Sequence, residues 1–201
     1  DLVAAYLRAY LSQVSHYAGE DEDDDFALHL GNTDGAVRAV LAEARLSSRV
    51  QLLDGLTRFE GDVRVFAEGE GVRRLGRTER RKVETAFTAY LDTIPESKKF
   101  DRELFYEVRD VVGRTGFGIG SAGLPAYNIL VEGYTQSLDN DVVLSMKQAN
   151  VPAISHVVDR AEVEKYFEHE GHRTVVSQRA LQVHTDPMLG HTTLDGVGYV
   201  V

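Results

Sequence analysis

The chain has 201 residues, a formal net charge of −10 at pH 7 and no cysteine. A hydrophobic content of 43% and a charged content of 27% are typical of a soluble globular protein of one large or two small domains. Without cysteine there are no disulfides, thiolate zinc sites or cysteine nucleophiles, and a reducing cytoplasm fits best. The negative charge argues against nucleic acid as a partner, and no apolar run is long enough to predict a membrane span.

The first part of the chain is predicted to be mainly helical. Apolar residues recur at helical spacing from Leu2 to Val14, which predicts an amphipathic helix that ends near Gly19. The acidic run 19–25 is too charged to pack and is interpreted as a solvated loop. Counted from Asp21, it lacks the glycine and glutamate positions of a calcium-binding loop, which argues against a metal site. Two further helical segments are expected, from the caps at residues 32–34 to Ala44 and over Val50 to Leu56.

A Gly-Asp turn signal within residues 59–66 predicts a small hairpin. Thr78 is then expected to cap a helix that carries Val83 and Phe87 and is stopped by Pro95. A basic cluster lies at the start of this helix: Arg73, Arg74, Arg77, Arg80, Arg81 and Lys82. We interpret the cluster as a solvated helix start, with an anion-binding patch as the alternative.

From about Tyr106 the apolar period changes from helical spacing to alternation, which predicts strands. Strands are expected over 106–112, 127–131, 142–149 and 192–201. Helices are expected over 161–170 and 171–184, and the second of these helices is predicted to point Val175, Val176, Leu181 and Val183 inward. The sequence thus predicts an α+β protein with a mainly helical region over 1–100 and a sheet-and-helix region over 101–201. Because it opens at Asp1 in a helical pattern, we expect the chain to be a piece of a longer protein.

Residues 118–123 (Gly-Ile-Gly-Ser-Ala-Gly) have the G-x-G-x-x-G spacing of two unrelated nucleotide sites. In a dinucleotide-binding unit the third glycine opens a helix, but Pro125 and an extended β-branched run follow here, which argues against an oxidoreductase. In a protein-kinase N-lobe the glycines form a flap between two strands, and a later strand supplies a lysine to the phosphates. Lys147 occupies that later strand, so the order of elements favours the second layout.

Phosphates are bound by backbone N–H groups, which glycines leave accessible, and by cations. Six residues are therefore predicted to bind a nucleotide: Gly118, Gly120, Ser121, Gly123, Ser145 and Lys147. Ser145, two residues before the lysine, leaves room for a purine ring. The candidates for orienting the lysine are Gln178, Glu170, Glu168 and Gln182. The alternative is an ordinary hairpin and a solvated edge lysine.

The C-terminal part contains several histidines and an arginine that could bind a ligand. The residues His169, Glu170, His172, His184 and His191 do not have the spacing that places two imidazoles on one helix face, which argues against zinc. Arg179, in an otherwise apolar helix, is expected to bond to an acid, a carbonyl or a phosphate. The chain contains no Ser-His-Asp pattern or nucleophile elbow.

Three stretches resemble the uncharacterised bacterial family called domain of unknown function 2252. They are 114–123 (Arg-Thr-Gly-Phe-Gly-Ile-Gly-Ser-Ala-Gly), 146–149 (Met-Lys-Gln-Ala) and 171–182. The resemblance implies a kinase-like or aminoglycoside-phosphotransferase-like fold, and hence a kinase-like N-lobe in the second half of this chain. Gln148 and Val176 stand at positions that are often acidic in the family, and its catalytic-loop and metal-binding motifs are not found in this chain.

Taken together, these features predict a cytoplasmic, ATP-binding phosphotransferase of kinase-like fold, with Mg²⁺ as the accompanying metal. The metal ligands and the catalytic base are not in this chain, and the acceptor is an unknown small molecule or protein. The alternative is a kinase-like pseudoenzyme or protein-interaction module that does not transfer phosphate.

Overall fold

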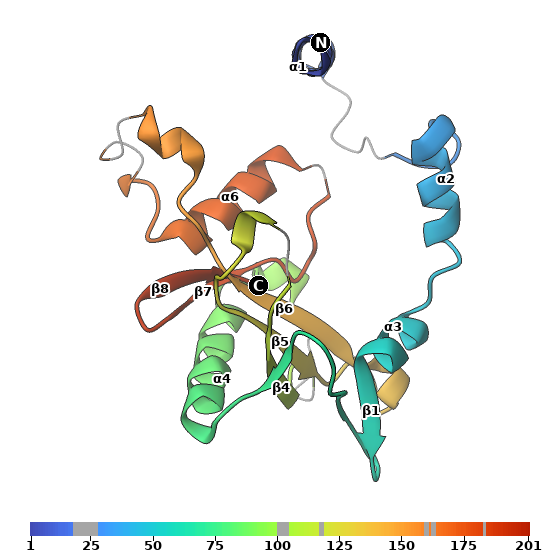
Figure 1. Ribbon diagram of the computed structural model, residues 1–201, viewed down its shortest axis with the longest axis vertical. Coiled ribbons are helices and arrows are strands. Elements are labelled where there is room, and N and C mark those ends of the chain that lie inside the picture. Colours follow the sequence, from blue (N-terminus) through green and yellow to red (C-terminus); the bar gives the residue numbers. More distant parts are fainter. Residues whose placement is uncertain (18–27, 100–104, 117–118, 159–160, 162–163, 183) are drawn as a thin grey trace.

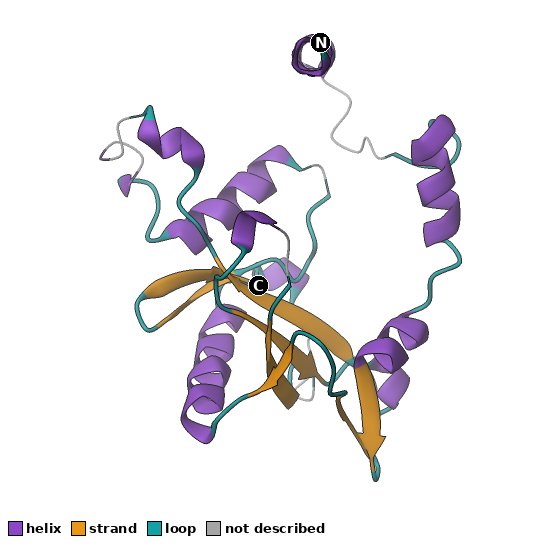
Figure 2. Ribbon diagram, viewed as in Figure 1, coloured by secondary structure: helices purple, strands orange, loops and turns teal. Residues whose placement is uncertain are grey.

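A computed structural model describes residues 1–17, 28–99, 105–116, 119–158, 161, 164–182 and 184–201. Its main body is a six-stranded antiparallel sheet with helices packed against it (Figures 1 and 2). This confirms the prediction of an α+β fold with an antiparallel sheet. The predictions for the acidic run 19–25, Gly118 and Val183 lie outside the described residues.

The strand order of the main sheet is β3-β4-β5-β6-β8-β7, and all neighbours are antiparallel. The strands are β3 (Val72–Arg74), β4 (Val108–Arg114), β5 (Ala126–Val131), β6 (Val142–Gln148), β7 (His191–Leu194) and β8 (Val197–Val200). Every residue of the central strand β5 is buried, which explains its continuous apolar character. The glycine segment, with the short 3-10 helix Ile119–Ser121, connects the neighbours β4 and β5.

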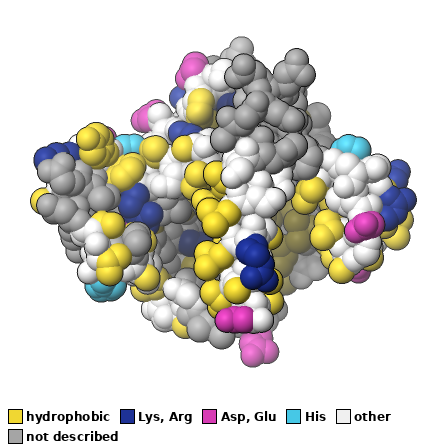
Figure 3. All heavy atoms as spheres, turned by 90° about the horizontal axis from the view of Figure 1, so that it is seen from above, with side chains coloured by type: hydrophobic (Ala, Val, Ile, Leu, Met, Phe, Trp, Pro, Cys, Tyr) yellow, Lys and Arg dark blue, Asp and Glu magenta, His cyan; other side chains and the backbone are white. Residues whose placement is uncertain are grey.

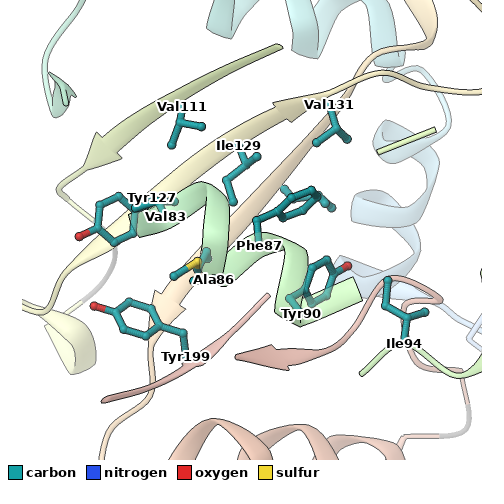
Figure 4. Packing of buried hydrophobic residues seen from close by; sticks show 12 residues of the cluster. Val83, Ala86, Phe87, Tyr90, Ile94, Val111, Tyr127, Ile129, Val131 and Tyr199 are labelled. Atoms are coloured by element: carbon teal, nitrogen blue, oxygen red, sulfur yellow. The ribbon is translucent and has the colours of Figure 1, made fainter. Parts of the chain in front are cut away.

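Helix α4 (Arg77–Leu91) covers one face of this sheet and forms the larger core (Figure 4). Val83, Phe87 and Tyr90 of α4 are buried against Ile129 of β5 and Met146 of β6. The opposite face carries a smaller core made with helix α3 (Arg49–Leu56) and the hairpin β1 (Thr57–Glu60) and β2 (Val63–Phe66). Elements from both sides of residue 100 therefore share the same sheet and core.

Helix α6 (Glu170–Leu181) packs against the hairpin β7–β8. The approach is close at Gly171, where an added Cβ would lie 2.3 Å from the carbonyl oxygen of Tyr199. The structure also corrects the predicted inward face of this helix. Val175 is buried, but Val176 is 38% exposed and Leu181 is 85% exposed. The helical periodicity was therefore right, and the assignment of the two exposed residues to the core was wrong.

Two strands were missed or merged by the sequence analysis. Residues 72–74 form the edge strand β3 rather than the start of a helix, and α4 begins at Arg77 after the N-cap Gly76, so Thr78 is not the cap. Residues 192–201 are not one strand but most of the hairpin β7–β8. The hairpin turns at Asp195 and Gly196, whose φ angles of 51° and 80° both have the positive sign that a tight type I′ turn requires.

Helices α1 (Leu2–Tyr17) and α2 (Gly35–Ala44) lie away from the main sheet (Figure 1). Their apolar residues have the predicted helical spacing but remain exposed, as at Leu2 (86%), Tyr6 (66%) and Val40 (65%). Figure 3 shows hydrophobic side chains exposed on the face seen from above, the end of the molecule at which α1 lies. The remaining short 3-10 helices are Glu96–Lys98, Leu138–Asn140 and Ala153–His156.

Candidate functional site

A pocket of about 630 Å³ lies at the end of the sheet where the glycine segment joins β4 to β5. The strands β3, β4, β5 and β6 contribute to its lining, β4 and β6 with their ends and β5 with its start. The first turn of α4 and the glycine segment complete the lining. The charged and hydroxyl-bearing side chains in this lining are Arg73, Glu79, Arg114, Thr115, Ser121, Tyr127 and Lys147. The pocket thus combines glycine backbone with several cations.

Three of the predicted nucleotide-binding residues line this pocket: Ser121, Gly123 and Lys147. Gly120 is exposed next to it but is not part of the lining. Ser145 also lies outside the lining, and its hydroxyl donates a hydrogen bond of 3.2 Å to Oδ1 of Asn128 on the neighbouring strand. The structure therefore brings the lysine and the glycine segment to one cavity, without Ser145.

None of the four candidates for orienting the lysine is among the pocket-lining residues. Glu170 accepts a hydrogen bond of 2.5 Å from Nε of Arg173 on the same helix. Glu168 and Gln182 are exposed, and Gln178 is half-buried on α6. The role proposed for these residues stays a prediction.

The pocket contains a hydrogen-bonded group that sequence reasoning did not find. Arg73 on β3 donates two hydrogen bonds, of 2.6 and 2.7 Å, to the carboxylate of Glu79 on α4. The hydroxyl of Tyr127 donates a third, of 3.2 Å, to the same carboxylate. The hydrogen bonds from Arg73 lower the pKa of Glu79, and burial raises the pKa of Tyr127 to about 12, so at neutral pH the acid is charged and the phenol is protonated.

Gly113 permits this arrangement, because it lies between Arg73 and Tyr127 in the register of the sheet. A Cβ at this position would lie 2.9 Å from Nη2 of Arg73, so the guanidinium rests directly over the glycine backbone. Arg73 belongs to the basic cluster that the sequence analysis interpreted as a solvated helix start. The strand that carries it, β3, has only three residues and is too short to show the alternating pattern of a strand.

Most of the basic cluster is neutralised by ion pairs. Arg74 and Arg80 both contact the buried carboxylate of Asp110, at 2.6 and 3.2 Å. Lys82 lies 2.8 Å from Asp195 in the turn of the last hairpin. Of the cluster, only Arg73 lines the pocket at the glycine segment.

The other predictions concern metal and the arginine of α6. Among the residues that the structure describes, no group of three or more His, Asp or Glu side chains is arranged to hold a metal ion. The rings of His172 and His191 stack with their centroids 4.7 Å apart, and the ring of His169 meets that of His191 edge-on at 5.1 Å. Nη2 of Arg179 donates to the backbone carbonyl oxygens of Leu189 (2.5 Å) and Thr93 (3.2 Å), which is the carbonyl alternative of the prediction.

The fold and the pocket define an α+β protein with a cationic cavity at one end of an antiparallel sheet. The chain belongs to DUF2252, a family of uncharacterized proteins conserved in bacteria, whose family model matches residues 1–201. The match confirms the family resemblance and extends it over the first hundred residues.

No curated protein and no solved structure shows a significant match to the chain. The comparisons therefore assign the family but no activity, and they do not connect the fold with kinases. In the described part of the chain, no helix is both long enough and apolar enough to cross a membrane.

Proposed function

We propose that this protein binds a nucleoside triphosphate in the pocket at the glycine segment and acts as a phosphotransferase of kinase-like fold. The observation that carries the proposal is that Lys147 lines the same cavity as Ser121 and Gly123. A phosphoryl site needs backbone N–H groups and a cation on one anion, and this cavity offers both.

The topology supports the proposal. The glycine segment connects two adjacent antiparallel strands, β4 and β5, and β6 with Lys147 is the next strand in the sheet. This order of elements is compatible with the proposal, because kinases hold nucleotide phosphates between a glycine-rich connection of two strands and a lysine on the next strand. The residue opposite Lys147 is Ala126, which also lines the pocket and has only a methyl group as its side chain.

In the proposed function this chain supplies the groups that bind the nucleotide, whereas the described lining of the pocket supplies little for the transfer step. Glu79 is the one carboxylate in the described lining, and it already accepts hydrogen bonds from Arg73 and Tyr127. This lining does not supply the paired acids that often hold Mg²⁺, so the metal would enter mainly on the phosphates of the nucleotide.

The second candidate is a kinase-like pseudoenzyme or interaction module that binds a nucleotide without turnover. It is favoured by the ion pair between Glu170 and Arg173, which engages one of the acids expected to orient the lysine. The two candidates differ in product formation. Release of ADP that requires Lys147 would support the enzyme, and binding without ADP release would support the module.

Thermal unfolding of the protein with and without Mg-ATP tests the binding step. A ligand at about 100 times its Kd stabilises a protein by about 2.7 kcal/mol, which corresponds to roughly 5–10 °C in Tm for a chain of this size. Lys147→Ala is expected to remove this shift, whereas Lys98→Ala, at an exposed position outside the pocket, is expected to keep it. A wild-type protein whose Tm does not respond to Mg-ATP would contradict the proposal.

A further inference from the structure

We propose that Arg114 is the second cationic ligand of this pocket and that, together with Lys147, it binds a chain of two or more phosphates. The inference rests on the proposed nucleotide site and deepens it, because it names a second cationic residue and the part of the ligand that this residue binds. Three observations carry it: the register of the sheet, the unpaired guanidinium, and the charge of the lining.

The register places the two cations on one face of the sheet. Arg114 is paired with Ala126, and Ala126 is paired with Lys147, so the three residues form a row across β4, β5 and β6. Directly opposed residues of antiparallel strands point to the same face. At about 4.8 Å per strand, the two Cα atoms lie roughly 10 Å apart with only a methyl group between them. An extended anion fits this gap between two long cationic side chains.

The guanidinium of Arg114 has no hydrogen-bond or ion-pair partner among the residues that the structure describes. Its Nε atom is buried and makes no hydrogen bond, and the side chain has no ion pair with any residue that the structure describes. The neighbouring arginines differ, since Arg73, Arg74 and Arg109 each bind a carboxylate. A half-buried arginine that lacks a partner is unfavourable, because desolvation of its donors is not compensated. A phosphate in the pocket would compensate it.

The charge of the lining fits a polyanion. Three cationic side chains (Arg73, Arg114 and Lys147) and one carboxylate (Glu79) give the described lining a net charge of +2, within a chain of net charge −10. Glu79 neutralises Arg73 through two hydrogen bonds. Arg114 is therefore the arginine of this lining that no carboxylate of the described residues engages. Arginine binds phosphate oxygens in a planar, bidentate manner, whereas lysine acts as a point charge.

The test measures binding of ATP, AMP and inorganic tripolyphosphate to the wild type, to Lys147→Ala and to three further variants by calorimetry. Arg114→Met removes the cation and keeps the length of the side chain, and Arg114→Lys keeps the charge but loses the bidentate geometry. Arg45→Met, at an exposed arginine outside the pocket, is the matched control. ATP is expected to bind Arg114→Met about 10- to 100-fold more weakly, Arg114→Lys at an intermediate level, and the control as tightly as the wild type.

The stability of the unliganded protein separates a binding role from a structural one. A ligand-binding Arg114 predicts that Arg114→Met has an unchanged or higher Tm without ligand, because a buried unpaired donor is removed. A clear loss of Tm in the unliganded Arg114→Met and Arg114→Lys variants would show that the side chain supports the fold and would overturn the inference.

The ligands separate the remaining outcomes. Weaker binding of ATP to Arg114→Met than to the wild type supports the inference. If the wild type binds tripolyphosphate as tightly as ATP, the ligand is a free phosphate chain. If the wild type binds tripolyphosphate more weakly than ATP, the ligand is a nucleotide. AMP bound as tightly as ATP would refute the polyphosphate class. If Lys147→Ala loses ATP but Arg114→Met does not, the inference fails and the proposed function stands. If the wild type binds none of the three ligands, the proposed function fails as well.

Discussion

Asp141 is a buried acid whose replacement by asparagine is expected to change how the stability of the protein depends on pH. Its side chain is 0% exposed, and neither carboxylate oxygen accepts a hydrogen bond from the residues that the structure describes. The buried Glu132 lies nearby, and Nε of Arg64 is 3.9 Å from Oδ2. Burial, and then the charge of Glu132, raises the pKa of Asp141 to about 6.

The size and sign of the effect follow from this pKa. The difference between about 6 and the ordinary value of 3.8 is worth at most about 3 kcal/mol. Because the pKa is higher in the folded state, the protonated acid favours folding. This stabilisation is complete below pH 3.8 and is lost as the pH rises through 6. Between pH 5 and pH 7 the loss is roughly 1.3 kcal/mol by the same linkage relation.

The assay is urea denaturation of the wild type and of Asp141→Asn at several pH values from 5 to 7. The amide cannot ionise, so the wild type is expected to lose about 1 kcal/mol relative to this variant over that range. Asp62→Asn, in the exposed turn of the hairpin β1–β2, is the control and should run parallel to the wild type. A difference between the wild type and Asp141→Asn that is constant with pH, or that grows in favour of the wild type, would refute the reasoning.

Two further predictions concern packing. Phe87→Ala removes a side chain that is 1% exposed in the core beneath α4, and it is expected to lower the free energy of unfolding by about 3–5 kcal/mol in urea denaturation. A loss below about 1 kcal/mol would mean that α4 does not pack as described. Gly171→Ala places a Cβ 2.3 Å from the carbonyl oxygen of Tyr199 and is expected to lower Tm, whereas Gly55→Ala, in open space on α3, is expected to raise it slightly. Equal Tm changes in these two variants would contradict the packing of α6 on β8.

The sequence predicted the elements whose periodicity is long and regular. The alternation after Tyr106 and the apolar runs before Lys147 correctly located β4, β5 and β6, because burial on a sheet leaves a period of two or an unbroken apolar run. The strand β3 was missed because three residues, two of them arginine, carry no such pattern. The hairpin β7–β8 was predicted as one strand because its turn, Asp195 and Gly196, interrupts the strand-like composition for only two residues.

For the candidate site, the sequence identified the glycine segment and Lys147 but not the arginines that share their cavity. Glycine spacing and a strand lysine are local patterns, and they are visible along the chain. Arg73 and Arg114 reach the cavity through strand pairing between residues far apart in sequence, which no local pattern reports.

By itself the sequence determined the fold class, the family and the segment that contains the glycines, because these depend on composition, periodicity and short motifs. Only the tertiary structure decided which charges are neutralised and which face the cavity. Arg73 is held by Glu79, whereas Arg114 has no partner in the described chain and lies opposite Lys147 across Ala126. The physical reason is that the free energy of a charge depends on its burial and on its neighbours in space, and these neighbours are set by the register of the sheet.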